Sequence, residues 1–312
     1  MTTGDPSPDS GQGSSPASRQ GSSPASRQSS SPASRQSSSP ASRQSSSPAS
    51  RLSRGWGYSR PWRLLSVIIL RPSLLLLIRN KWRGRENIPA SGGVILAPNH
   101  VSYVDWGTDA LFCYASGRYP VFMIKASVFK VPVIGHFLYR AGQLPVHRGR
   151  ADAALVLKEA EQALAKGACV IIYPEATATR DPDLWPMVSK TGAARLALTT
   201  GCPVIPVAHW GTAQILPYGS KRVFSGLFLP PRKTVSTVAG KPVDLSSWIG
   251  KERSGRALRE ATTAIMRDVA GLVGELRGEQ PPAELYDPAN ADAARIGTVK
   301  AEAGGGEAEA GT

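Results

Sequence analysis

His100 and Asp105 are the two residues of this chain whose types and spacing point most directly to chemistry. They follow an apolar run at residues 93–97, which is typical of a buried strand. If the strand ends at Pro98-Asn99 and a helix starts near Ser102, His100 lies on the connecting turn. Asp105 then lies in the first helical turn, where the helix dipole keeps its carboxylate ionised. A carboxylate held against an imidazole fixes its tautomer and stabilises the imidazolium, as a general base requires. A structural histidine beside a helix-capping aspartate is the alternative interpretation.

The chain beyond residue 85 alternates between short apolar runs and helical segments, and this alternation predicts how the pair is positioned. Strands are expected at residues 93–97, 119–124, 143–146, 169–173, 204–208 and 233–239, and helices at residues 105–114, 152–167, 190–200 and 250–276. Short, continuous apolar strands between helices are typical of an α/β fold with a largely parallel sheet covered by flanking helices. Sites in such sheets gather at the carboxyl ends of strands, where His100 and Glu175 both fall.

Four sequence blocks stand in order along this region. They are Asn-His-Val-Ser-Tyr-Val-Asp at residues 99–105, Gly-Gln-Leu-Pro-Val-His-Arg at 142–148, Tyr-Pro-Glu-Ala-Thr-Ala-Thr-Arg at 173–180, and Pro-Val-Ile-Pro-Val-Ala at 203–208. From about residue 64 to residue 245, the chain resembles the glycerolipid acyltransferases, specifically the 1-acyl-sn-glycerol-3-phosphate acyltransferases. The first block is close to that family's Asn-His-x-Ser-x-x-Asp.

The resemblance implies an O-acyltransferase of phospholipid biosynthesis. Such an enzyme moves an acyl chain from an acyl thioester of coenzyme A or acyl carrier protein to the free hydroxyl of 1-acyl-sn-glycerol 3-phosphate, which gives phosphatidic acid. By resemblance, His100 is the base and Asp105 orients it. The alternatives are another lipid or glycerol 3-phosphate as acceptor, or a catalytically silent membrane-binding module.

The resemblance also implies residues that bind the acceptor. Arg148 corresponds to the family's phosphate-binding arginine, and Lys125 and Lys190 fall where the family carries lysines near that phosphate. The family's Glu-Gly-Thr corresponds to Glu175-Ala176-Thr177, which implies acceptor binding by Glu175 and Thr177. Ala176 departs from the family's glycine, and this puts a positive φ at that position in doubt.

Other polar residues have structural interpretations. Ser102 is read as capping the helix, with a nucleophilic role as the alternative. His136 is read as a packed or rim residue, whereas His147 could help to bind phosphate and His209 could line the cleft. The sequence has no zinc, phosphate-loop or dinucleotide fingerprint, so we predict no metal and no bound cofactor.

Residues 61–85 combine apolar and basic character. Arg71-Pro72 divides an apolar stretch into two pieces of about 15 Å as helices, half the thickness of a roughly 30 Å hydrocarbon core. We therefore predict a short membrane-interfacial helical hairpin, with a true span or packing onto the core as alternatives. Its cations interleave with Leu and Ile, which favours an anionic membrane surface over nucleic acid: Arg63, Arg71, Arg79, Lys81, Arg83 and Arg85.

The composition divides the chain, whose formal net charge is +14, into four parts. Residues 1–60 contain a Ser/Pro/Arg octapeptide repeat that is too poor in apolar residues to fold, so a disordered tail is expected. The interfacial hairpin (61–85) and the acyltransferase domain (86–277) follow, and residues 278–312 are expected to form a disordered acidic tail. The expected location is the cytoplasmic face of the cell membrane, with peripheral or monotopic attachment.

Overall fold

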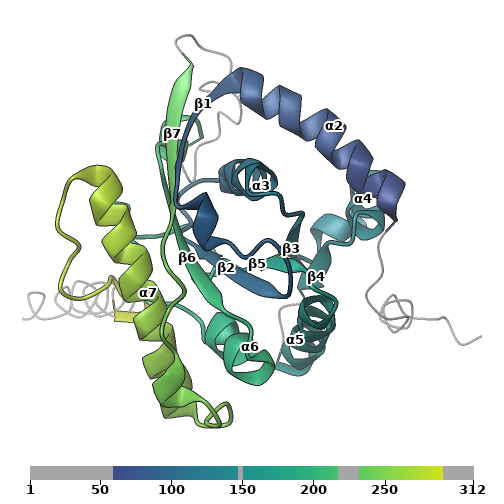
Figure 1. The fold of residues 1–312 in the computed structure, drawn as a ribbon. Helices are drawn as coiled ribbons and strands as arrows, with labels where there is room; N and C mark the ends of the chain where they lie inside the picture. The colour runs from purple at the N-terminus through teal and green to yellow at the C-terminus, as the bar shows by residue number, and fades with distance from the viewer. Residues whose placement is uncertain (1–58, 147–149, 217–231, 291–312) are drawn as a thin grey trace, which may run out of the picture. The chain divides into compact units, whose positions relative to one another are not determined.

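Seven strands form one sheet in the computed structural model, which describes residues 59–146, 150–216 and 232–290 (Figure 1). The strands are β1 Ile78–Arg83, β2 Val94–Pro98, β3 Pro120–Lys125, β4 Leu144–Val146, β5 Cys169–Ile171, β6 Val204–Trp210 and β7 Lys233–Ala239. Their order across the sheet is β1-β7-β6-β2-β5-β3-β4. All neighbouring pairs are parallel except β6 and β7, which are antiparallel. The predicted largely parallel sheet is confirmed.

Helices cover both faces of this sheet. They are α2 Arg60–Leu77, α3 Asp105–Ala115, α4 Ile134–Arg140, α5 Arg150–Ala165, α6 Gly192–Thr200 and α7 Gly255–Arg277. Figure 1 shows α5, α6 and α7 along one face and α3 on the other, with α2 lying beyond α3. All helices of the predicted core are present, and the flanked α/β architecture is confirmed.

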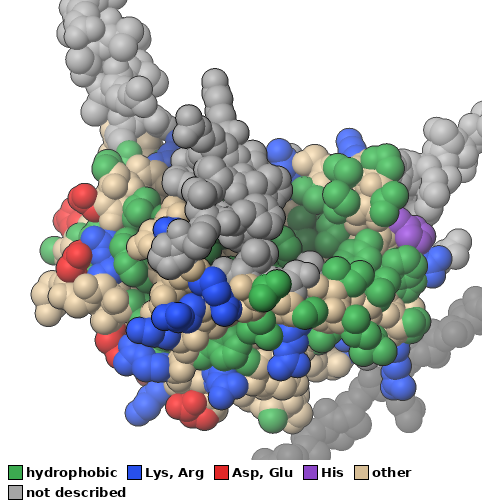
Figure 2. Space-filling view, turned by 90° about the horizontal axis from the view of Figure 1, so that it is seen from above, with side chains coloured by type: hydrophobic (Ala, Val, Ile, Leu, Met, Phe, Trp, Pro, Cys, Tyr) green, Lys and Arg blue, Asp and Glu red, His purple; other side chains and the backbone are tan. Residues whose placement is uncertain are grey.

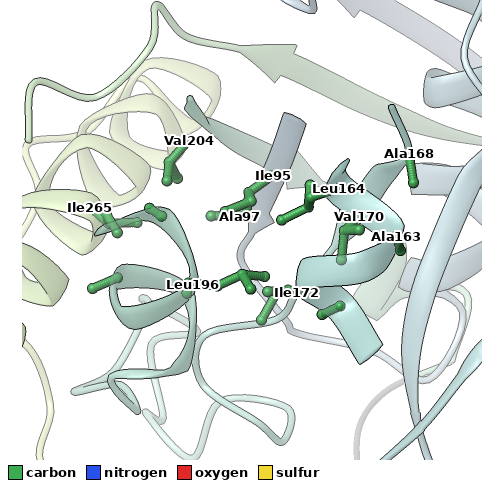
Figure 3. Packing of buried hydrophobic residues seen from close by; sticks show 14 of the residues in the cluster. Ile95, Ala97, Ala163, Leu164, Ala168, Val170, Ile172, Leu196, Val204 and Ile265 are labelled. Carbon is green, nitrogen blue, oxygen red and sulfur yellow. The ribbon is translucent and has the colours of Figure 1, made fainter. Parts of the chain in front are cut away.

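Strand β2 is apolar at every position because both of its faces are covered. Val94 and Leu96 pack with α3, whereas Ile95 and Ala97 pack with α5, α6 and α7 (Figure 3). Successive side chains of a strand point to opposite faces, so a strand covered on both faces is apolar throughout. Full burial of a Val, Leu or Ile side chain contributes roughly 1.5–3 kcal/mol to the stability of the fold. Because β2 to β6 run parallel to one another, their carboxyl ends lie along one edge of this well-packed sheet.

The predicted helical hairpin is wrong. Arg60–Leu77 form a single helix with Pro72 inside it, and the chain continues directly into β1, which pairs with β7. Gly107 of α3 lets this helix approach closely, since a Cβ there would lie 3.3 Å from Leu74. Contacts with α3 therefore stabilise α2 across the proline. Within the described residues, no helix is both long and apolar enough to cross a membrane.

The prediction of a disordered tail is wrong for residues 278–290. Tyr286 pairs in parallel with Met187, and the Val188 amide donates to the Tyr286 carbonyl at 2.9 Å. Residues 278–290 thus lie against the core through backbone hydrogen bonds, which a composition of Pro, Ala and Glu does not indicate. The predicted tail segments 1–58 and 291–312 lie outside the described residues.

Candidate active site

The structure brings His100 and Asp105 together at the carboxyl end of β2. His100 lies on the turn that follows the strand, α3 begins at Asp105, and His100 Nδ1 is 2.7 Å from Asp105 Oδ2. The side chain of His100 is 19% exposed, whereas that of Asp105 is fully buried. The imidazole is thus the part of the pair that a substrate can reach. Because Nδ1 is held by the carboxylate, Nε2 is the nitrogen available to accept a proton.

The Asp105 carboxylate is held as an anion. Its Oδ2 also accepts the backbone N–H groups of Val101 and Ser102 at 2.7 and 2.8 Å. Burial by itself raises the pKa of Asp105, but the imidazoles of His209 and His100 outweigh burial and hold that pKa well below its ordinary value. An ionised, hydrogen-bonded carboxylate in this position can orient the His100 ring and stabilise its protonated form.

A second histidine lies behind Asp105. His209, near the end of β6, is fully buried, with Nε2 3.1 Å from Asp105 Oδ1 and Nδ1 3.2 Å from Asp109 Oδ1. Burial lowers the pKa of His209, but the two carboxylates overcome this effect and raise it well above its ordinary value. His209 thus lies buried between two carboxylates, which favour its protonated form.

Tyr173 closes this arrangement into a ring. Its hydroxyl donates to Asp109 Oδ2 at 2.6 Å, and its aromatic ring stacks on the His100 imidazole with the centroids 4.4 Å apart. Burial and the nearby carboxylates Asp109 and Asp105 raise the pKa of Tyr173 well above its ordinary value, so the hydroxyl remains a donor. The imidazole of His100 is therefore held at Nδ1 by Asp105 and across its face by Tyr173.

Asn99 joins the two strands that carry the histidines. Its side-chain amide donates to the His209 carbonyl at 3.1 Å and accepts the His209 N–H at 2.9 Å. Both partners are fully buried. This pairing fixes the end of β2 to β6, which gives the asparagine of the first sequence block a positioning role.

Glu175 lies beneath the His100 backbone. Oε1 accepts the His100 N–H at 2.8 Å and Oε2 accepts the Met187 N–H at 3.2 Å. Burial raises the pKa of Glu175 to about 8, against the effect of these two hydrogen bonds. In this structure the carboxyl group therefore supports the turn that carries the histidine, and the acceptor-binding role implied by the resemblance stays a prediction.

The other predicted binding residues that the structure describes lie along the same sheet edge. Lys125 ends β3 next to Val146 of β4, and its side chain is exposed. Lys190 is exposed just before α6, with its N–H donating to the Pro174 carbonyl at 2.9 Å. Thr177 is half-buried in the loop after β5. Arg148, which follows β4, lies outside the described residues.

Ser102 and the remaining histidines have other surroundings. The Ser102 hydroxyl is buried and donates to the Leu216 carbonyl at 2.6 Å, so its proton is not held by His100. His136 is exposed on α4 and makes an edge contact with Trp62. His147 lies outside the described residues. Within those residues, no group of three or more His, Cys, Asp or Glu side chains is arranged to hold a metal ion.

Ala176 adopts the conformation that its departure from glycine puts in doubt. Its φ is +59°, in the left-handed region, which costs a residue with a Cβ about 1–2 kcal/mol. We expect Ala176→Gly to raise the free energy of unfolding by about 0.5–1 kcal/mol, because relief of this strain exceeds the added entropy of the unfolded chain. Chemical denaturation measures the change. Ala264→Gly inside α7 is the matched control, and it should lower stability by about 1 kcal/mol. A loss of stability in both variants would contradict the strain at Ala176.

The buried partners behind the pair were the residues that sequence reasoning missed. Asp109 lies one helical turn after Asp105, so both face the same side of α3, and this spacing was the available signal. His209 was only a candidate for lining the cleft, and Tyr173 was noted only as part of its block. Their convergence depends on β5 and β6 being the two neighbours of β2, which the sequence does not state.

Fold and site together define a class of protein. It is an α/β protein with a buried carboxylate and a partly exposed histidine at the carboxyl ends of parallel strands, a pair suited to general-base catalysis. The family model described as Acyltransferase matches residues 79–210, from β1 to the end of β6. This match confirms the resemblance to the acyltransferases predicted from the four sequence blocks.

Curated relatives carry the name implied by that resemblance. A chloroplastic 1-acyl-sn-glycerol-3-phosphate acyltransferase of Brassica napus is 33% identical over 145 residues, which cover 46% of this chain and 40% of the relative. The enzyme of that name from Borreliella burgdorferi is 32% identical over 41% of this chain and 50% of the relative. The one from Bacillus subtilis is 25% identical over 62% of this chain and 88% of its own length. The chain thus spans about half the length or less of the first two relatives.

Among solved structures, the chain is similar to the 1-acyl-sn-glycerophosphate (LPA) acyltransferase PlsC from Thermotoga maritima. The similarity covers 70% of this chain and 83% of that one, with 22% sequence identity and a TM-score of 0.49.

Proposed function

We propose that this chain is an O-acyltransferase that transfers an acyl chain from an acyl thioester to the free hydroxyl of 1-acyl-sn-glycerol 3-phosphate, forming phosphatidic acid. The observation that carries the proposal is the His100–Asp105 pair, 2.7 Å apart, inside the acyltransferase-family part of the chain. The names of the relatives support the choice of acceptor. Coenzyme A or acyl carrier protein delivers the thioester, and no bound cofactor is required.

The geometry supports a direct transfer in which His100 carries the proton. Nε2 takes the proton of the acceptor hydroxyl while its oxygen attacks the thioester carbonyl, and the Asp105 carboxylate stabilises the imidazolium that forms. The tetrahedral intermediate then collapses, the C–S bond breaks, and the thiolate takes the proton from Nε2. Ser102 donates its hydroxyl to a backbone carbonyl and is not used as a nucleophile.

The cations of the same sheet edge suit the acceptor's phosphate. Lys125 ends β3 and Lys190 precedes α6, so both lie at the edge carrying His100, and Arg148 follows β4 in the sequence. Arginine binds phosphate through its two-pronged guanidinium and lysine as a point charge. We assign acceptor binding to these residues together with Thr177, with Glu175 holding the His100 turn from beneath.

An assay with defined acceptors and donors tests the proposed reaction. Purified full-length protein is incubated with lysophosphatidate or glycerol 3-phosphate, each with acyl-coenzyme A or with acyl carrier protein thioester. Phosphatidate formed from lysophosphatidate is the expected product. Acylation of glycerol 3-phosphate but not of lysophosphatidate would show that the proposed acceptor is wrong. No acyl transfer with any acceptor–donor pair would contradict the proposed activity and favour a catalytically silent membrane-binding module.

We propose that α2 and α4 attach the protein to a membrane. On α2 several apolar side chains point outward, with Leu64 60%, Ile68 59% and Leu76 73% exposed, while the polar Ser66 is buried. A run of exposed apolar side chains like this one is unusual for a helix in water. In Figure 2, hydrophobic side chains occupy much of the face seen from above in Figure 1, with Lys and Arg side chains beside them.

The segment at α4 extends this apolar surface. Trp62 of α2 packs edge-on against Phe137 of α4, so the two helices are neighbours. Val133, just before α4, is 82% exposed and has a φ of +66°, which is strained for a β-branched residue. Exposed basic residues on these elements suit anionic headgroups: Arg60, Arg71, Lys130 and Arg140. We propose peripheral attachment at the cytoplasmic face, with the lipid acceptor entering from the bilayer.

Removing this apolar surface should release the protein from lipid. We expect Leu64→Ser/Ile68→Ser to weaken binding to anionic vesicles by roughly tenfold per substitution, because each change removes apolar area that would be buried in the acyl region. Vesicle sedimentation measures binding, and thermal unfolding checks the fold. Ile249→Ser, at a 72% exposed residue outside α2 and α4, is the matched control and should bind as the wild type does. Equal binding by all three proteins would contradict the assignment of this surface.

A further inference from the structure

A closed ring of contacts connects His100 to groups that a substrate cannot touch. Asp105 bridges His100 and His209, Asp109 bridges His209 and Tyr173, and Tyr173 stacks back on His100. His209 is fully buried, and Asp105 and Asp109 are 0% and 3% exposed. The general-base pair needs only one carboxylate, so a buried imidazole and a second carboxylate call for a separate explanation.

We propose that His209 is a positioning residue that holds a positive charge behind Asp105 and thereby limits how strongly this carboxylate draws a proton onto His100. The proposal rests on the proposed function of His100 as a base. His209 itself touches neither substrate nor reacting atoms and acts through Asp105.

The geometry favours a protonated His209. Each ring nitrogen faces a carboxylate oxygen, Nε2 at 3.1 Å and Nδ1 at 3.2 Å. Nδ1 is hydrogen-bonded to Asp109, whereas Nε2 and Asp105 Oδ1 are in ion-pair contact without hydrogen-bond geometry. An imidazolium presents an N–H to each carboxylate, whereas a neutral imidazole would turn a lone pair toward one of them. Two buried carboxylates without a cation would also be costly in free energy. The raised pKa of His209, which follows from Asp105 and Asp109 despite burial, agrees with this assignment.

The charge of this cluster determines which form of His100 is stable. With His209 protonated, Asp105, Asp109 and His209 carry a net charge of −1, and without that proton they carry −2. A histidine beside a charge of −2 would hold a proton more firmly, so a smaller fraction of it would be free to accept one from a substrate hydroxyl. A charge of −1 still stabilises the imidazolium formed during the reaction. By its charge, His209 thus sets how firmly His100 holds a proton and how readily His100 can take one from the substrate.

The other titratable groups facing His100 do not replace this charge. Tyr173 lies over the ring and stays protonated, and Glu175 contacts the His100 backbone N–H from below. Neither can supply a cation. In the described part of the chain, the imidazole of His209 is the cationic group that contacts Asp105 from behind.

Substitutions that change the cluster charge test the proposal, and NMR provides the readout. The chain has four histidines, so the imidazole of His100 can be assigned and titrated in the intact protein. His209→Gln makes the cluster −2 and should raise the His100 titration midpoint by about one pH unit, whereas Asp109→Asn makes it neutral and should lower the midpoint by a similar amount. The double variant restores −1 and should return the midpoint to that of the wild type. The midpoint of the acid limb in the pH dependence of kcat/KM should shift in the same directions in the three variants.

A purely structural role would give a different result. If His209 only fills space or makes hydrogen bonds, all three variants should lose stability. The His100 titration midpoint should then not shift in opposite directions in the two single variants, and the double variant should not return to the wild-type midpoint. Unchanged or same-direction midpoints would therefore overturn the proposal. If thermal unfolding shows that His209→Gln does not fold, Asp109→Asn and the double variant still give the comparison. The titration needs no acyl substrate, so it remains decisive even if the acyltransferase assay fails.

Discussion

His100→Ala is expected to reduce kcat by roughly 10²–10⁴-fold, the range over which a positioned general base contributes to a reaction. Without the imidazole, the acceptor hydroxyl must lose its proton to water as it attacks the thioester. The KM for the acceptor should change much less, because the cations proposed to bind its phosphate, Lys125, Arg148 and Lys190, remain. Steady-state kinetics with lysophosphatidate and an acyl thioester measures both constants.

The fold of the His100→Ala variant must be checked, because the imidazole packs on Tyr173 and bonds to Asp105. Its partial exposure of 19% predicts a modest stability loss, which thermal unfolding measures. A folded variant that retains wild-type kcat would show that His100 is not the base. Equal losses in kcat and in acceptor binding would instead place the histidine in recognition of the acceptor.

The core strands were predictable because their surroundings impose a simple pattern. Residues 94–98 are buried on both faces of the sheet, so an uninterrupted apolar run marks β2, and the same holds for β5 and β6. The turn after β2 also followed from sequence, since Pro98 and Asn99 end the run just before a helix with an acidic first turn. The pairing of His100 with Asp105 is therefore predictable from the sequence alone.

Edge elements were harder to predict because their pattern is mixed. Strand β1 alternates buried and half-buried Ile78, Asn80 and Trp82 with exposed Arg79, Lys81 and Arg83, as suits an edge strand. In the sequence this alternation follows a longer apolar run and was read as part of a membrane hairpin. The partner that makes it a strand, β7, lies about 150 residues further along the chain.

The buried part of the site depends on three-dimensional neighbours. His209 meets Asp105 because β6 is beside β2, and Tyr173 reaches His100 because β5 is on its other side. Local spacing could associate Asp109 with Asp105 but could not bring in residues from two other strands. A lone histidine near a strand end is compatible with many roles, and its two carboxylate contacts decide between them.

Asp105→Asn is expected to reduce kcat by on the order of 10³–10⁴-fold, because the substitution favours the wrong tautomer of His100. The carboxylate faces donors on every side: the N–H groups of Val101 and Ser102, Nδ1 of His100 and Nε2 of His209. An amide NH₂ cannot accept from them, so either a buried donor is left unpaired or the His100 ring moves its proton to Nε2 and loses its basic site. An unpaired buried group costs about 1–3 kcal/mol, so the free energy of unfolding should fall as well.

Kinetics and thermal unfolding of Asp105→Asn separate these two effects. Asp268→Asn, the same chemical change at an exposed position of α7, is the matched control and should leave both quantities close to those of the wild type. Raising the pH should not restore turnover, since the defect lies in the tautomer and not in the protonation of His100. An Asp105→Asn protein with full activity at any pH would exclude Asp105 as the residue that orients the base, and the ring of contacts behind it would then serve stability alone.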